Sequence, residues 1–446
     1  MIRMAGIRLA IVALALVFSL PPVGGEGAIA AAILEATQKD GGLAAVLQFA
    51  ERGDTILLKA GVYRGPVMID KPVTLKGVPG AIIDAGGAGS AVHVTAPDVT
   101  VIGLTIRGSG SDHERKDAGV FLGKQAHRAQ VIDNEILGNL VGVYVLGAKD
   151  AEVRGNVIVG RQDHRMNDRG NGVYVWNAPG AIVMFNDIRY GRDGIFVNAS
   201  KRNKFIGNRM RDLRFAVHYM YTHNSEVSGN ESYDNNAGYA LMFSDRLTVR
   251  SNLAVNSKRH GILLNYANKS TFENNKVVRG GERCVFIYNS NRNAFTRNWF
   301  EGCDVGIHFT GGSEGNGVIG NAFLGNKRQV KYVGTKWVEW SSAGRGNYWS
   351  DHTGFDVNGD GIADTAYKPN DLVDQILWRH PTAKALLQSP AFGILRWAQG
   401  QFPAMYPGGV IDRAPLMTPF APELPHHWQE AGGPAVASHQ QSKEAM

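Results

Sequence analysis

Two neighbouring stretches of the sequence combine side chains that bind soft metal ions. The first, RFAVHYMYTH, contains His218, Met220 and His223. The second, GYALMFSD, contains Met242. Thioether and imidazole groups together suit a soft cation, above all Cu(I). Methionine is equally a common filler of apolar gaps and a common interface residue, so the interpretation depends on where these side chains point.

A repeat of about 22–23 residues runs through most of the chain, with one longer step of 30 residues between Asn156 and Asn186. Each unit has a small residue that opens a strand and an Asn in matching phase. Units this short cannot bury an apolar face alone, so they must stack on their neighbours. The repeat predicts an all-β fold, a single-stranded right-handed parallel β-helix over residues 53–350. The Asn markers are Asn134, Asn156, Asn186, Asn208, Asn230, Asn252, Asn275, Asn298 and Asn321.

The segments outside the repeat differ from it in composition. Residues 1–30 have basic residues, an apolar run and a small-x-small pattern, which indicates a signal peptide and an exported, periplasmic chain. Residues 31–52 are predicted to form an N-terminal cap with a short helix. Residues 370–418 contain amphipathic patterns that predict a helical extension. Residues 419–446 are rich in Pro, His and Gln and are predicted to be disordered.

The outward positions of the predicted strands are unusually apolar. Side chains alternate along a strand, so the second and fourth positions after each small residue point outwards. His218 and Met220 share that face, and Met242 follows Met220 one rung along. The insertion with His164 and Met166 enters the same sheet and can reach over it. We therefore predict copper ligands at His218, Met220, Met242 and His223, with further ligands at His164 and Met166.

A continuous apolar patch on an outer face is typical of a partner-binding surface. The large apolar residues of the same rows, and those of the predicted helices, are the candidates. They are Tyr144, Tyr174, Trp176, Phe196, Phe286, Tyr288, Leu377, Trp378, Leu395 and Trp397.

Residues 351–369 contain a second candidate metal site. Oxygen-bearing side chains alternate, with Gly361 at the bend, as in a calcium loop. No Glu closes the loop at its twelfth position, unlike in an EF-hand. The pattern predicts a structural calcium site, and a solvated acidic turn is the alternative. The ligands would be Asp356, Asn358, Asp360 and Asp364.

The net charge and the cysteine content bear on the possible partners and crosslinks of the chain. The formal net charge is +7, but no dense Lys/Arg tract occurs, so nucleic acid is a poor candidate partner. The sequence has two cysteines, Cys284 and Cys303. An exported chain permits a disulfide between them, whereas two small buried side chains would be the simpler interpretation.

Many β-helix proteins act on acidic polysaccharides, so a uronate epimerase or lyase is the rival class. A glycosidase site needs paired carboxylates on one face, and the outward positions contain no Asp or Glu. The loop residues Asp163 and His164 keep this class open.

Four stretches resemble the NosD family: HYMYTH, GYALMFSDRL, RMNDRGNGVYVWN and NYWSDHTGFDVNGDGIADTAY. The resemblance covers residues 40–418 and implies a right-handed parallel β-helix without catalysis of its own. Family members are periplasmic and help to assemble the copper–sulfur centre of nitrous oxide reductase. The implied partners are an ABC transporter of permease and ATPase, a copper chaperone lipoprotein and the apo-reductase. The resemblance implies that the C-terminal helices dock on the transporter and that the chain contacts the membrane only through it. The species that the chain handles would be copper or a sulfur species.

Overall fold

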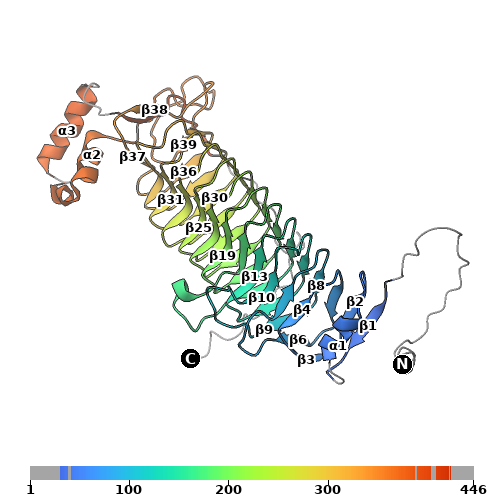
Figure 1. The fold of residues 1–446 in the computed structure, drawn as a ribbon. Coiled ribbons are helices and arrows are strands. Elements are labelled where there is room, and N and C mark those ends of the chain that lie inside the picture. Colours follow the sequence, from blue (N-terminus) through green and yellow to red (C-terminus); the bar gives the residue numbers. More distant parts are fainter. Residues whose placement is uncertain (1–30, 39–41, 387–388, 403–407, 421, 423–446) are drawn as a thin grey trace, which may run out of the picture.

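The computed structural model describes residues 31–38, 42–386, 389–402, 408–420 and 422, which form a parallel β-helix (Figure 1). The predicted signal peptide lies outside the described residues, as does nearly all of the predicted disordered tail. Three long sheets, here called sheets A, B and C, run along the axis, and every strand in them pairs in parallel with its neighbours. The predicted fold class is therefore confirmed.

Sheet C forms the face that bears the candidate site. Because its strands follow one another at the repeat length, equivalent residues of successive rungs lie side by side. Its 12 strands are β4 (Val67–Ile69), β7 (Val92–Val94), β10 (Ala118–Leu122), β13 (Val141–Leu146), β16 (Val173–Trp176), β19 (Asp193–Asn198), β22 (Phe215–Met220), β25 (Ala237–Met242), β28 (His260–Asn265), β31 (Arg283–Tyr288), β34 (Val305–Thr310) and β37 (Val330–Val333).

Sheets A and B close the coil and have 13 strands each. Sheet A comprises β1 (Ile33–Ala36), β2 (Thr55–Leu58), β5 (Thr74–Gly77), β8 (Thr100–Ile102), β11 (Gln130–Ile132), β14 (Glu152–Arg154), β17 (Ile182–Met184), β20 (Lys204–Ile206), β23 (Glu226–Ser228), β26 (Thr248–Arg250), β29 (Thr271–Glu273), β32 (Ala294–Thr296) and β35 (Gly317–Ile319). Sheet B comprises β3 (Gly61–Arg64), β6 (Ala81–Asp84), β9 (Thr105–Arg107), β12 (Glu135–Leu137), β15 (Val157–Val159), β18 (Asp187–Arg189), β21 (Arg209–Arg211), β24 (Glu231–Tyr233), β27 (Leu253–Val255), β30 (Lys276–Val278), β33 (Trp299–Glu301), β36 (Ala322–Leu324) and β39 (Tyr348–Trp349).

The recurring Asn residues form a buried ladder along the axis. Asn208 illustrates it: its amide nitrogen donates to Oδ1 of Asn230 at 2.9 Å and to the carbonyl of Val183 at 2.9 Å. Its own Oδ1 accepts from the backbone N–H and the side-chain amide of Asn186. The ladder pairs the polar groups of each turn with the next turn, because unpaired polar groups in the core would be costly.

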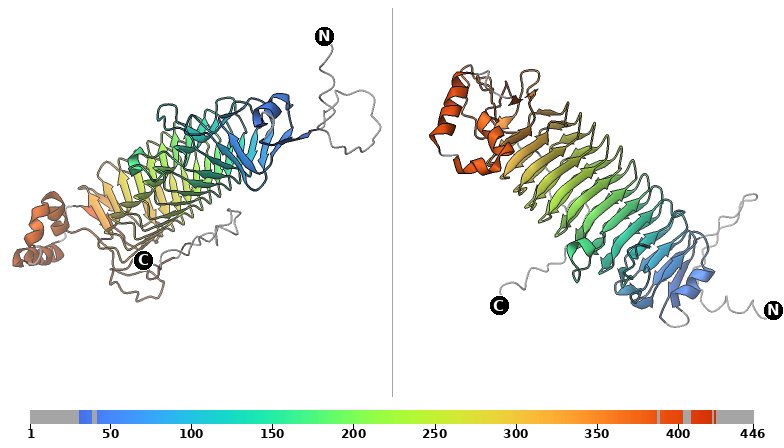
Figure 2. Two further views of the ribbon diagram at one scale, coloured as in Figure 1. Left: turned by 90° about the horizontal axis from the view of Figure 1, so that it is seen from below. Right: turned by 60° about the vertical axis from the view of Figure 1, so that its left-hand side comes forward.

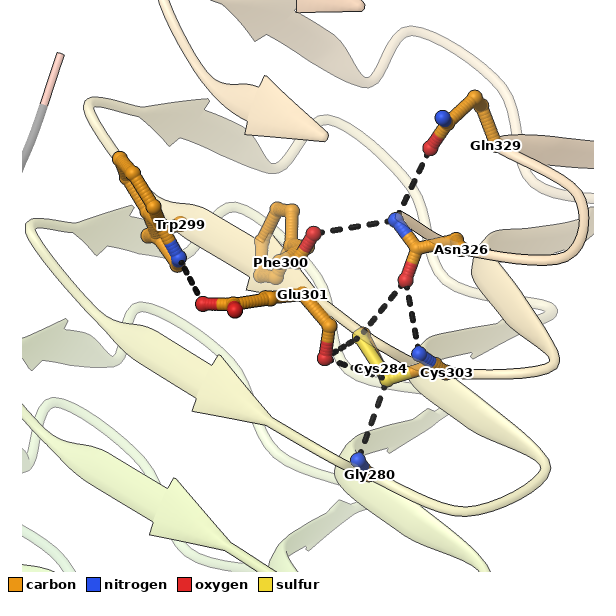
Figure 3. The surroundings of a disulfide bond; sticks show 8 residues. All are labelled: Gly280, Cys284, Trp299, Phe300, Glu301, Cys303, Asn326 and Gln329. Atoms are coloured by element: carbon orange, nitrogen blue, oxygen red, sulfur yellow. Dashed lines mark hydrogen bonds between the residues drawn. A yellow bond between two sulfur atoms is a disulfide. The ribbon is translucent and has the colours of Figure 1, made fainter. Parts of the chain in front are cut away.

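The two cysteines form a disulfide, so the simpler interpretation of two free buried side chains is wrong. Cys284 lies in β31, and Cys303 lies in the turn before β34 (Figure 3). Both residues are buried. The Cys303 sulfur also accepts a hydrogen bond from the backbone N–H of Gly280 at 3.2 Å. The bond links two segments of the same coil.

The ends of the β-helix carry the remaining elements. Helix α1 (Gly42–Phe49) packs at the N-terminal end as the expected cap. Helices α2 (Leu372–Arg379) and α3 (Pro390–Gln401), with the 3-10 helix η2 (Pro381–Leu386), project from the far end (Figures 1 and 2). The chain then returns as a strand, since β40 (Gly409–Ile411) pairs in parallel with β38 (Trp337–Glu339). Among the described helices, none has the length and apolar character that a membrane crossing needs.

Candidate functional site

The outer face of sheet C carries a column of stacked rings. The ring column, as we call it, consists of His93, Phe121, Tyr144, Tyr174, Phe196 and His218, one from each successive rung. Neighbouring ring centroids lie 4.5 to 5.2 Å apart. This distance follows from the spacing of about 4.8 Å between strands. The column runs without interruption and has an imidazole at each end.

Part of this face is less accessible than the alternation of side chains indicated. Side chains at outward positions of a strand were expected to face water. This is wrong for Tyr144, Tyr174 and His218 of the ring column, which are buried. The rings cover one another, and Leu140 and Val141 pack against them in an apolar cluster. Burial raises the pKa of the Tyr144 hydroxyl, which stays protonated.

His218 is held by a buried ion pair. Its Nδ1 lies 3.0 Å from Oδ2 of Asp193, which is fully buried. Arg214 donates to both oxygens of the same carboxylate, from Nε at 2.8 Å and from Nη2 at 2.6 Å. Burial alone would raise the pKa of Asp193, but the hydrogen bonds from His218 and Arg214 outweigh it, so the pKa is lowered. The carboxylate is therefore ionised and accepts from both neighbours.

This contact selects the tautomer of His218. A carboxylate acceptor beside Nδ1 favours the proton on Nδ1 and leaves a lone pair on Nε2 in the neutral ring. Nε2 is buried and has no hydrogen-bond partner. An imidazole whose other nitrogen donates to a carboxylate is the usual arrangement of a metal-binding histidine. His218 can thus offer the lone pair of Nε2 to a metal ion.

The two methionines lie on the same face of sheet C as His218. Met220 follows His218 on β22, and it is in register with Met242 on β25. Both side chains are half-buried. Residues two apart on a strand share one face, and paired residues of adjacent parallel strands are about 4.8 Å apart. The structure therefore places the two thioethers and the His218 imidazole on the same face of sheet C.

His223 is oriented differently from His218. The backbone N–H of Asp245 donates to Nδ1 of His223 at 3.1 Å. In the neutral ring this contact places the proton on Nε2, and no lone pair remains for a metal. His223 also lies in the turn beyond β22. The geometry does not favour the predicted ligand role of His223.

The insertion reaches the edge of sheet C, but at the opposite end of β25 from Met242. Met166, in the 3-10 helix η1 (Met166–Asp168), is half-buried, and its sulfur lies 3.7 Å from Nδ2 of Asn236, the residue before β25. His164 is exposed and lies 3.6 Å from Asp163. Arg169 holds the loop by donating to the carbonyls of His164 and Gln162. Met166 therefore lies about 20 Å along the strand from Met242, because Asn236 and Met242 are six residues apart, and His164 faces solvent. The geometry does not favour a ligand role for either residue at this site.

The predicted partner-binding residues divide into exposed and packed groups. Trp176 and Tyr288 are exposed on sheet C, and Phe196 and Phe286 are half-buried. In the helical extension, Leu377 is buried and Leu395 packs against the same cluster. Trp378 is half-buried, with Lys331 over its ring, whereas Trp397 is 65 % exposed.

The predicted calcium loop is closed by hydrogen bonds of its own. Asp356 accepts from the backbone N–H groups of Gly359 and Gly361, and Asp364 accepts from that of Val357. Asn358 Nδ2 donates to Asp360 at 3.1 Å. Nowhere in the described part of the chain do three or more His, Cys, Asp or Glu side chains converge as a metal site would require. Calcium at this loop stays a prediction.

Several residues of interest had not been identified from the sequence. Asp193 and Arg214 are the first. A second group is a stack of rings in the turns that follow the sheet C strands. Tyr221 and Tyr266 are exposed and Phe243 between them is half-buried, with ring centroids 5.1 and 5.3 Å apart. All three have positive φ angles of 50 to 53°, which is unusual for bulky residues. Aromatic residues at equivalent turn positions of three successive repeats were the available signal.

The fold defines a protein of the parallel β-helix class. The A-module of a mannuronan C-5 epimerase from Azotobacter vinelandii superposes with a TM-score of 0.53 and 14% identity, over 63% of this chain and 87% of that module. A mannuronic acid specific family 6 polysaccharide lyase from human gut microbiota gives a TM-score of 0.53 at 11% identity, over 72% of this chain and 87% of the lyase. At such low identity, these similarities concern the fold alone.

Sequence relationships are more specific. Residues 154–354 match the family described as "Periplasmic copper-binding protein (NosD)". A "Probable ABC transporter binding protein NosD" of Stutzerimonas stutzeri is 43% identical over 81% of this chain and 86% of its own length. Its namesake in Pseudomonas aeruginosa is 42% identical over 81% of this chain and 87% of its own length. The chain belongs to the NosD family.

Proposed function

We propose that this chain is a periplasmic copper-handling accessory protein of an ABC transporter. The observation that carries the proposal is His218, whose Nδ1 is held by Asp193 while Nε2 is buried and unpaired. The family description, periplasmic and copper-binding, agrees with this chemistry. The names of the relatives supply the transporter. Copper is here the cargo and not a resident cofactor.

The residues around His218 suit transient binding of Cu(I). A neutral imidazole and thioethers are soft ligands, and they carry no charge that would trap the ion. The positive charge of Arg214 balances Asp193, so the carboxylate positions His218 without acting as a ligand. We propose His218, Met220 and Met242 as the ligands, without Met166, whose contact with Asn236 lies at the other end of β25 from Met242.

The same surface argues for binding without catalysis. Asp193 is the carboxylate in contact with His218, and it is fully buried between Arg214 and the imidazole. A general acid or base must reach its substrate. We therefore propose that the chain assists the maturation of another protein, namely the assembly of the copper–sulfur centre of nitrous oxide reductase. A copper chaperone lipoprotein would be the donor.

The helical extension is the proposed contact with the transporter. Helix α3 and the residue after it leave large apolar side chains uncovered: Ile394 is 63 % exposed, Trp397 65 % and Phe402 61 %. Such a patch on a projecting element is typical of an interaction site. Leu377 and Leu395 instead hold α2 and α3 together. The permease is the proposed partner, and the ATPase would act through it.

Anaerobic Cu(I) titration against a competing chelator tests the copper site. We expect tight binding by the wild type and its loss in a His218→Asn, Met220→Leu, Met242→Leu variant. Asn keeps a donor for Asp193, and Leu keeps the volume of Met, so the fold is retained. The matched control is Met417→Leu with His113→Asn, two exposed positions far from the site in the sequence. Equal affinity in all three proteins would refute the site.

A further inference from the structure

The far end of the ring column repeats the ligand types of the candidate site. His93 is the first ring of the column, and it is in register with Met68 on the preceding strand β4. Paired residues of adjacent parallel strands are about 4.8 Å apart and point to the same face. A thioether and an imidazole thus lie side by side on the outer face.

Both side chains have free donor atoms. Met68 is 51 % exposed. His93 is half-buried. Within the described residues no hydrogen bond involves its ring nitrogens, and its contact is the edge of Phe121, with centroids 4.5 Å apart. Gly123 leaves room beside the ring, because even an added Cβ there would lie 3.9 Å from Nε2.

A groove opens beside Met68. The groove lies between α1 and the strands β3 and β4, has a volume of about 680 Å³, and is lined by Met68 together with Leu43, Leu47, Val62 and Pro66. Its walls are polar and apolar in similar measure, with Arg64, Asp70 and Lys71 among the lining residues. A soft cation bound to a thioether needs no charged wall around it. Met68 is therefore accessible from solvent and His93 beside it is half-buried, whereas His218 is buried.

We propose that Met68 and His93 form a second, solvent-accessible binding site for Cu(I), at the opposite end of the ring column from His218. Two soft ligands suffice for a weakly held ion in transit. The two ends are five rungs apart, which corresponds to roughly 24 Å at the strand spacing. One ion cannot bridge that distance, so the sites fill independently. The role of this second site rests on the proposed copper-handling function. The choice of Met68 and His93 as its ligands does not.

Stoichiometry distinguishes the two sites. We expect the wild type to bind Cu(I) at both sites in an anaerobic titration with a competing chromophoric chelator. A Met68→Leu, His93→Phe variant should lose one equivalent and keep the inner site. Phe retains the ring stacked on Phe121, and Leu retains the volume of Met68. The His218→Asn, Met220→Leu, Met242→Leu variant should lose the other equivalent.

The outcomes separate the two proposals. If the Met68→Leu, His93→Phe variant binds as many equivalents as the wild type, the second site is wrong, whatever the inner-site variant does. If it loses one equivalent while the inner-site variant loses none, the second site stands and the proposed ligands around His218 are wrong. The Met417→Leu, His113→Asn control should bind like the wild type.

A measurement on the unaltered protein guards against misfolded variants. Exposed methionines are oxidised to the sulfoxide by peroxide. We expect Met68 to be oxidised in the free protein and protected by two equivalents of Ag(I), a redox-inert substitute for Cu(I), with the site identified by peptide mass spectrometry. Met417 should be oxidised equally with and without Ag(I). Oxidation of Met68 that Ag(I) does not slow would overturn the proposal.

Discussion

Oδ2 of Asp193 lies 3.0 Å from Nδ1 of His218 and 2.6 Å from Nη2 of Arg214. One buried carboxylate therefore satisfies a guanidinium and orients an imidazole at the same time. The His218 ring is also held by Phe196 and Phe215, with centroids 4.8 and 5.0 Å away. The lone pair on Nε2 is thereby fixed in one direction before any metal arrives.

Asp193→Asn should weaken both the fold and the copper site. The neutral amide no longer compensates Arg214, and removing one partner of a buried pair costs about 3 kcal/mol of unfolding free energy. A weaker hold on Nδ1 should lower the Cu(I) affinity about 10- to 100-fold. Urea unfolding and chelator competition measure the two effects. His218→Asn, which keeps a donor for Asp193, should lower copper affinity with a smaller loss of stability. The opposite order would contradict the positioning role of Asp193.

Asn208→Ala should be among the most destabilising substitutions outside the apolar core. The change leaves the carbonyl of Val183 and the donors of Asn186 without partners in a fully buried region. Each unpaired group costs about 1–3 kcal/mol, so we expect a loss of about 3–5 kcal/mol in urea unfolding. Thr248→Ala, at an exposed position of β26, should change stability by less than about 0.5 kcal/mol. Similar effects for the two variants would argue against the ladder.

Replacing both Cys284 and Cys303 by Ala should destabilise the fold by about 3 kcal/mol. The bond closes a loop with a sequence separation of 19 residues, and a crosslink of that length restricts the unfolded chain by about this amount. Because both residues are buried, a mild reductant should leave the native disulfide intact. Thiol labelling with and without urea measures this. Rapid reduction of the folded protein would contradict the buried placement.

Acid should weaken the C-terminal rungs through His308. Burial, followed by the nearby charges of Lys331 and Arg283, lowers its pKa to about 3, and burial lowers that of His260 to about 4. Since an unfolded histidine has a pKa near 6.5, the unfolded chain binds more protons below that pH. The stability present above pH 6.5 is therefore lost as the pH falls towards 3.

His308→Asn tests this assignment. Its amide oxygen can still accept from Nε of Arg283, as Nδ1 of His308 does at 2.9 Å, but it does not titrate. The free energy of unfolding, measured between pH 7 and 4, should fall less steeply in this variant than in the wild type. Parallel curves would show that His308 does not carry the acid sensitivity. His113→Asn, at an exposed position, is the matched control.

The coil was predictable from the sequence because one residue marks each rung. Every Asn marker sits in the buried ladder, since only a side chain with both a donor and an acceptor can pair along the axis in both directions. The alternation of side chains likewise placed His218, Met220 and Met242 on one face. These features depend on residues within one repeat, and they recur in each repeat.

Asp193 was missed because the alternation breaks next to it. A Cβ added to Gly194 would meet the core side chains of Met210 and Leu213, and Ile195 is also buried in the core. Two consecutive residues therefore face inwards, as in a bulge. The phase shifts, and the residue before the small one joins the outer face. The same shift brings Arg283 beside His308.

Local sequence patterns also could not predict that the two cysteines pair with each other. A spacing of 19 residues is compatible with a disulfide inside one coil or with two unrelated buried thiols. The outcome depends on how the turn before β34 folds back against β31. The burial of Tyr144 and Tyr174 likewise depends on neighbouring rungs and on residues such as Leu140, which no single repeat contains.

The parallel stacking of sheet C has a mechanical consequence. Each rung is hydrogen-bonded to the next along the axis, so the solenoid resists bending. Over a few rungs it therefore moves as a rigid body. From β37, next to the helical extension, to β22 there are five rung steps, or roughly 24 Å. A tilt of about 10° at the helical end, within the range of ordinary rigid-body domain motions, would displace His218 by about 4 Å. A small rotation at one end thus becomes a displacement larger than a metal–ligand bond at the other.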